Sequence, residues 1–128
     1  MNPRAFILAA RILLVAMAAL VAHLATTDQS YPVASDVPDT VNHVLAFGAL
    51  ALLADFSFPA TRFGAAKVLP LLAYGALIEV VQSFLPYREA SLADLAADAT
   101  GIAIYAVAMP LVLRAPFLRA LSGMRGPP

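Results

Sequence analysis

Four long apolar segments, joined by short connections that contain prolines, make up most of this chain. We predict helices over residues 5–25, 41–58, 67–85 and 92–113. Because ~20 apolar residues cross the hydrocarbon core of a bilayer, these segments are membrane spans by length. Hydrophobic residues make up 62% of the 128 residues and charged residues 12%, whereas soluble domains average ~45–50% and ~25%. The sequence therefore predicts one domain over residues 1–128, an all-α integral membrane four-helix bundle.

Prolines and glycines inside these segments indicate where the helices begin, kink or pack against one another. Pro70 is expected in the first turn of the third helix, where a proline is tolerated. Pro110 lies near the end of the fourth segment, where it is expected to kink or end the helix. Small residues let membrane helices approach closely, so Gly48, Gly75 and Gly101 are predicted contact points between helices.

Basic residues fall mainly on one side of the predicted bundle. Seven of the eight lie at helix ends that share a side: Arg4, Arg11, Arg62, Lys67, Arg114, Arg119 and Arg125. Because cytoplasmic loops are enriched in Lys and Arg, both termini are predicted to be cytoplasmic, including a tail over residues 119–128. Arg4 and Arg11 before an apolar run also resemble a secretory signal, although we favour a first helix that is retained. Asp55 is expected to pair with Arg62 on this side.

Two classes of site are excluded by composition. The chain has no cysteine, which excludes disulfides, thiolate metal sites and a cysteine nucleophile. Its formal net charge is zero, and it has no basic stripe with interleaved aromatic residues, so no nucleic-acid partner is expected.

Seven of the eight acidic residues fall toward the predicted outer side, opposite to most of the basic ones. The deepest is Glu79, about six residues inside the end of the third segment, with Gln82 on the same face. An acidic group at the centre of a membrane helix costs at least ~2.5 kcal/mol, so it is a functional-site candidate by default. Hydrogen bonds between membrane helices average only ~0.6 kcal/mol, too little to explain a carboxylate by stability alone.

Asp39 and His43 open the second helix from the outer side. Their spacing of four places them on one face. Asp39 follows Pro38 and is expected to cap the helix. His43 lies one turn inside, where a single histidine is more often a hydrogen-bonded structural residue than a ligand.

Acidic residues also mark the start of the fourth helix. Ser91 and Asp94 have the spacing of a capping box. Asp98 lies one turn deeper on the same face, where a buried carboxylate needs a partner, a proton or a metal. Arg88 is expected to pair with Asp94 or Asp98, or to hold an anionic head group through its planar fork.

Taken together, these residues resemble the VanZ-like family of small bacterial membrane proteins over about residues 39–105. The resemblance is carried by three motifs: Asp39-Thr-Val-Asn-His43, Gly75-x-x-x-Glu79-x-x-Gln82-x-x-x-Pro86-x-Arg88 and Ser91-x-x-Asp94-x-x-x-Asp98-x-x-Gly101. Two positions differ: the family usually has lysine where this chain has Thr40, and asparagine where it has Asp98. Both differences make this site more acidic.

The resemblance implies a multi-pass protein of the bacterial cytoplasmic (inner) membrane that acts at the cell envelope. The founding member of the family is associated with antibiotic resistance, to the glycopeptide teicoplanin. The same association with glycopeptide susceptibility becomes an expectation for this chain.

The leading hypothesis is a cavity in the outer leaflet that binds an amphiphilic envelope component, either a lipid-linked wall precursor or a lipoglycopeptide. The expected ligand-binding residues are Asp39, His43, Glu79, Gln82, Arg88, Ser91, Asp94 and Asp98. Membrane lipids are the other expected partners.

Three alternatives stay open. The first is a hydrolase or transferase acting on a lipid head group, with His43, Glu79 and Asp94 as candidate catalytic residues. A divalent metal is possible there, because imidazole and carboxylate ligands suit one. The second is a proton- or cation-coupled transporter, which needs an oligomer to form a pathway. The third is a structural subunit of a larger complex.

Overall fold

The computed structural model describes residues 2–29 and 37–113, and within them it contains helices and no strand. The helices are α1 (Pro3–Thr26), α3 (Asp39–Ser57), α4 (Ala65–Ser83) and α5 (Leu92–Leu113). Every helix begins and ends within two residues of its predicted bounds. All four are long and apolar enough to cross a membrane. The predicted all-α four-helix architecture is therefore confirmed.

Parts of the charge argument lie outside the described residues. These are the tail over residues 119–128 and the basic residues Arg114, Arg119 and Arg125. The orientation of the helices relative to the two sides of a membrane stays a prediction.

The helix ends explain where the chain turns. Asn2 caps α1, because its Oδ1 accepts from the backbone N–H of Arg4 at 3.0 Å, and Pro3 follows as the first helical residue. The N-cap of α3 is Pro38, and no side chain caps this helix. The prediction that Asp39 is the cap is therefore wrong. Asp39 is instead the first helical residue, where its negative charge lies near the positive end of the helix dipole.

Two prolines lie inside helices. Helix α4 begins at Ala65, so Pro70 falls in the second turn and not, as predicted, in the first. Pro110 lies inside α5, which continues to Leu113, so this proline does not end the helix. A proline inside a helix lacks the N–H that would bond the preceding turn, so each of these helices lacks one backbone hydrogen bond at its proline.

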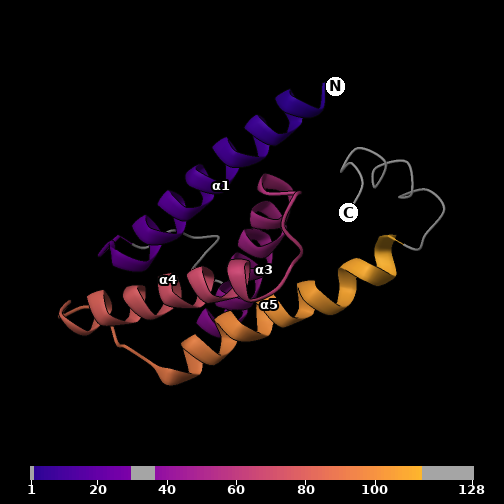
Figure 1. The fold of residues 1–128 in the computed structure, drawn as a ribbon. Coiled ribbons are helices and arrows are strands. Elements are labelled where there is room, and N and C mark those ends of the chain that lie inside the picture. Colours follow the sequence, from indigo (N-terminus) through magenta and orange to yellow (C-terminus); the bar gives the residue numbers. More distant parts are fainter. Residues whose placement is uncertain (1, 30–36, 114–128) are drawn as a thin grey trace.

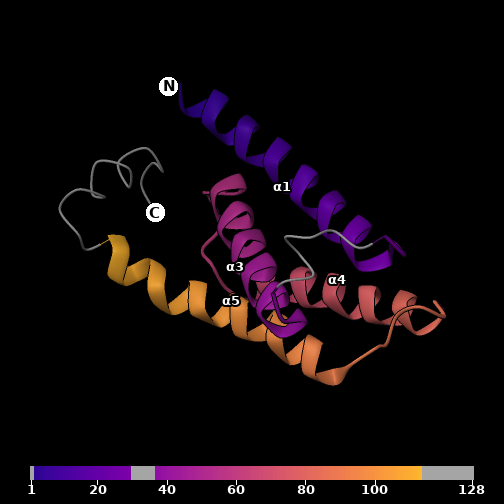
Figure 2. The ribbon, with the colours of Figure 1, turned by 180° about the vertical axis from the view of Figure 1, so that it is seen from behind.

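Helix α3 lies in the middle of the molecule, between α1 on one side and α5 on the other (Figures 1 and 2). Helix α4 packs against all three. The apolar core surrounds α3 and consists of Phe47, Leu50, Ala51, Ala54, Leu71, Ile78, Ile102 and Tyr105. In Figure 1 the ends of α1 and α4 and the beginning of α5 lie together on the left. We call this part of the molecule the polar end, because it contains His43, Glu79, Arg88, Asp94 and Asp98.

Helices α3 and α5 touch through their backbones. A Cβ added to Gly101 would lie 2.3 Å from the carbonyl oxygen of Val44 and 2.9 Å from the backbone nitrogen of Gly48. No real Cβ sits that close to backbone, so only glycine fits at position 101. The predicted contact role of Gly101 is confirmed, and the pairing partner is α3.

We expect Gly101→Ala to destabilise the protein by about 1–3 kcal/mol, because the neighbouring backbone cannot move aside. Gly48→Ala is the matched control, since a Cβ there would lie 3.5 Å from the carbonyl oxygen of Gly101, in ordinary contact. Unfolding in mixed detergent micelles, followed by circular dichroism, measures both variants. Equal stability of the two would contradict the close backbone contact.

A second polar cluster lies at the opposite end of α3 from His43. The carboxylate of Asp55 accepts from Lys67 Nζ at 2.8 Å and from the Tyr105 hydroxyl at 2.5 Å. Lys67 Nζ also donates to the backbone carbonyls of Thr61 and Asp55. Asp55 is 7% exposed and Lys67 is 5% exposed. The structure thus pairs Asp55 with Lys67, whereas the sequence had suggested Arg62, whose side chain is exposed.

Removing one partner of a buried ion pair leaves the other charge uncompensated and costs about 3–5 kcal/mol. We therefore expect Lys67→Met to lower the free energy of unfolding by about that amount, whereas Arg62→Met leaves it nearly unchanged. Thermal unfolding of the detergent-solubilised protein distinguishes them. A larger loss of stability in Arg62→Met would instead support the predicted pairing of Asp55 with Arg62.

Candidate functional site

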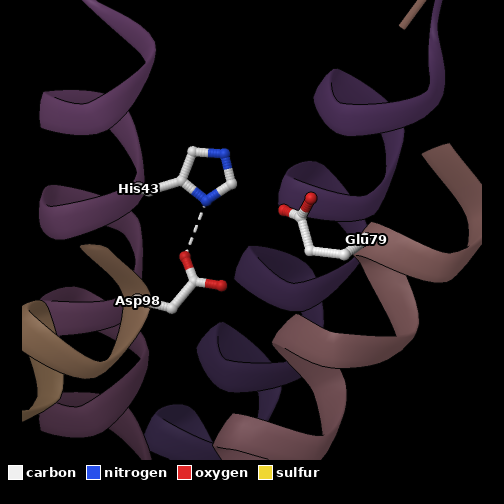
Figure 3. A group of neighbouring side chains, drawn as sticks. All are labelled: His43, Glu79 and Asp98. Carbon is white, nitrogen blue, oxygen red and sulfur yellow. Dashed lines mark hydrogen bonds and ion pairs between the residues drawn. The ribbon is translucent and has the colours of Figure 1, made fainter. Parts of the chain in front are cut away.

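His43 on α3 and Asp98 on α5 form the centre of the polar end (Figure 3). The His43 Nδ1 and the Asp98 Oδ1 lie 2.6 Å apart, a short hydrogen bond between two helices. The other ring nitrogen, Nε2, lies 3.7 Å from a carboxylate oxygen of Asp94. The imidazole thus lies between two carboxylates that are one turn apart on α5. The close contact at Gly101 brings these helices near enough for the bond to form.

Glu79 enters the same region from α4, and its carboxylate faces His43 and Asp98 in Figure 3. Its Oε2 accepts from the backbone N–H of Ser91 at 2.8 Å. Ser91 in turn caps α5, because its Oγ accepts from the backbone N–H groups of Ala93 and Asp94. In a capping box, the residue three positions after the cap would accept from the backbone N–H of the cap itself. Here Glu79 of another helix does so, and Asp94 is left to face His43.

Three side-chain oxygens at the polar end are buried without a hydrogen-bond partner in the described structure: Glu79 Oε1, Gln82 Oε1 and Asp98 Oδ2. Asp98 is 1% exposed and Glu79 is 9% exposed. Gly75 makes room for Asp98, since a Cβ at residue 75 would lie 2.5 Å from Asp98 Oδ2. Single ligand atoms of His43, Glu79 and Asp98 all lie within 4.8 Å of one another, which makes these three a candidate metal-binding group among the described residues.

Side chains of α4 and of the connection after it hold the end of α1. Gln82 Nε2 donates to the carbonyl of Ala25 at 2.9 Å. Arg88 donates to the carbonyls of Leu24 and Thr27 at 2.8 Å and 2.9 Å. The last carbonyls of a helix have no partner within it and attract cations. The prediction that Arg88 pairs with Asp94 or Asp98 is therefore wrong: in this structure its guanidinium caps α1.

A cavity of about 830 Å³ opens at the polar end. Six of the predicted site residues line it: Asp39, His43, Gln82, Arg88, Ser91 and Asp94. Apolar residues of the helices also line it: Met17, Leu20, Leu24, Leu45, Phe47 and Ile78. Glu79 and Asp98, the two other predicted residues, do not line this cavity and are buried. The structure therefore brings all eight predicted residues to one end, six of them at the cavity surface.

The sequence interpretation missed the contribution of α1. This helix provides backbone carbonyls to Gln82 and Arg88 and apolar side chains to the cavity. Its sequence contains only a generic apolar span, and carbonyl groups carry no residue signal. Asn42 belongs to the first motif of the resemblance, but no role in the site was predicted for it; the structure places it in the cavity wall.

Comparison of the chain with protein-family models, with curated proteins and with solved structures finds no match. The function is therefore argued from the site itself.

Proposed function

We propose that this protein lies in the bacterial inner membrane as a member of the VanZ-like family, with both termini in the cytoplasm. In that orientation the polar end faces the outer leaflet. The motif residues that carry the resemblance come from three different parts of the chain, and their gathering at one end supports the proposal.

In that setting the protein binds an amphiphilic component of the cell envelope. The observation that carries this proposal is the composition of the cavity wall. Side chains such as Met17, Leu20 and Phe47 form an apolar part, while His43 and Asp94 form a polar part. Ligand sites are mostly apolar, with a few polar groups that orient the ligand. An acyl or prenyl tail fits the apolar part, and a head group fits the polar part.

The charges of the cavity wall indicate the kind of head group. Four acidic residues line the cavity: Asp28, Asp39, Glu89 and Asp94. Arg88 is the only arginine or lysine among its lining residues, and its guanidinium already donates to the end of α1. Such a wall favours head groups rich in hydroxyl and amine donors over bare anions. Sugars and peptides provide these donors in lipid-linked wall precursors and in lipoglycopeptides such as teicoplanin. Binding either one would alter glycopeptide susceptibility.

The test is native mass spectrometry of the protein extracted gently from its own membranes. We expect the wild type to carry an amphiphile whose mass identifies the head group. Ala46→Leu adds bulk at the cavity wall and should reduce the retained fraction about tenfold, equivalent to ~1.4 kcal/mol of binding free energy.

Ala103→Leu provides the matched control, because Ala103 is exposed on the apolar surface of α5, away from this cavity. It should retain the amphiphile as the wild type does. Equal retention in both variants would show that the molecule is bulk lipid on the outside of the helices, and a wild type that carries none would remove the proposal. The recovered mass separates a wall precursor from an added lipoglycopeptide.

A further inference from the structure

The polar end has more buried acidic groups than it has partners for them. Asp94 and Asp98 both lie beside His43, which is the only basic side chain that the described structure gives them. Glu79 uses one oxygen for the backbone N–H of Ser91, and its other oxygen has no partner among residues 2–29 and 37–113. Burying a carboxylate without compensation costs several kcal/mol or more. A positively charged group from outside the chain would therefore stabilise these carboxylates.

The Asp55 cluster is a useful comparison, because there the protein provides hydrogen-bond and ion-pair partners for a buried carboxylate. Both oxygens of Asp55 have partners, one of them the ammonium group of Lys67. By contrast, Glu79 Oε1 and Asp98 Oδ2 have no partner in the part of the chain that the structure describes, although both side chains are at least nine-tenths buried. In Figure 3 the Glu79 carboxylate and the free oxygen of Asp98 face the same space beside the His43 ring.

We propose that His43, Glu79 and Asp98 form a binding site for a divalent metal cation. Each residue comes from a different helix, and their ligand atoms lie within 4.8 Å of one another. Zinc lies ~2.0–2.2 Å from such ligands in a tetrahedral arrangement, which places the ligand atoms ~3.3–3.6 Å apart. The three side chains would therefore close around the ion by about an ångström. One imidazole and two carboxylates suit zinc and related transition metals, whereas calcium takes six to eight oxygen ligands.

The cation would replace the proton that His43 Nδ1 and Asp98 Oδ1 share across 2.6 Å. Metal ligands bind in their deprotonated forms, so binding releases a proton. Three protein ligands leave a coordination position open, and His43 also lines the cavity. The metal would thus lie next to the cavity. The inference does not depend on the proposed amphiphile, because it is tested with the cation alone.

The experiment is a titration of the full-length, chelator-stripped protein in detergent micelles with Zn²⁺, in competition with a chromogenic chelator. We expect one Zn²⁺ per chain, an affinity that rises with pH, and a higher unfolding temperature in the presence of the metal. Mg²⁺ and Ca²⁺ should bind more weakly, because the site offers too few oxygen ligands for them.

Three pairs of variants separate this site from adventitious binding. The members of the site are removed by Asp98→Asn, Glu79→Gln and His43→Gln, and each should weaken Zn²⁺ binding at least about tenfold. The matched controls are Asp39→Asn, Glu89→Gln and His23→Gln, all at exposed residues, and each should bind as the wild type does. If Asp98→Asn fails to fold, Glu79→Gln carries the comparison.

Two results would overturn the inference. One is a wild type that takes up no Zn²⁺ even when the metal is in roughly 100-fold molar excess over the protein. The other is binding that persists in both Asp98→Asn and Glu79→Gln, or that is lost equally in Asp39→Asn, which would assign the metal to the exposed acids of the cavity wall.

Discussion

The backbone of α5 at Gly101 lies directly against the backbone of α3 at Val44 and Gly48, and the geometry of the polar end depends on this contact. Asp98 precedes Gly101 by three residues and therefore lies on the same face of α5. His43 immediately precedes Val44 on α3. Bringing the two backbones together thus sets the 2.6 Å bond between the His43 ring and the Asp98 carboxylate. Any side chain at residue 101 would push the helices apart and lengthen that bond.

The two polar clusters of this bundle differ in whether their carboxylates have hydrogen-bond and ion-pair partners. At one end, Asp55, Lys67 and Tyr105 balance charge and hydrogen bonds among themselves, which ties three helices together. At the other end, Glu79 and Asp98 each have one oxygen without a partner among the described residues. Both ends lie among apolar helices in which an unpaired charge is expensive. The difference indicates that the Asp55 cluster stabilises the fold, and it is the reason why the other cluster is the candidate binding site.

The helices could be predicted from the sequence because their apolar runs are long and the connections contain prolines. The composition of the site was also predictable, since a carboxylate such as Glu79 inside an apolar helix has few structural explanations. The partners of the basic side chains, by contrast, could not be predicted from the sequence. Arg62 is closer to Asp55 in the chain, but α4 begins at Ala65 and carries Lys67 back toward Asp55.

Arg88 shows a second limit of sequence reasoning. Its nearest acids in the sequence suggested an ion pair, yet its guanidinium donates to backbone carbonyls at the end of α1. Any residue type provides such carbonyls, so no sequence pattern identifies them. Asp39 was assigned as a cap for a related reason: its residue type fits the role, but the turn at Pro38 moves the start of the helix by one residue.

Glu79 connects the start of α5 to α4 in a way that also determines where the acids point. Because Glu79 accepts from the Ser91 backbone N–H, the carboxylate of Asp94 is not needed for the cap of its own helix. Asp94 can then turn to His43 and line the cavity. A cation or ligand that drew Glu79 away would free the Ser91 N–H and place Asp94 within reach of it, as in an ordinary capping box. Such a displacement would couple occupancy beside His43 to the position of the Asp94 carboxylate in the cavity wall through one hydrogen bond.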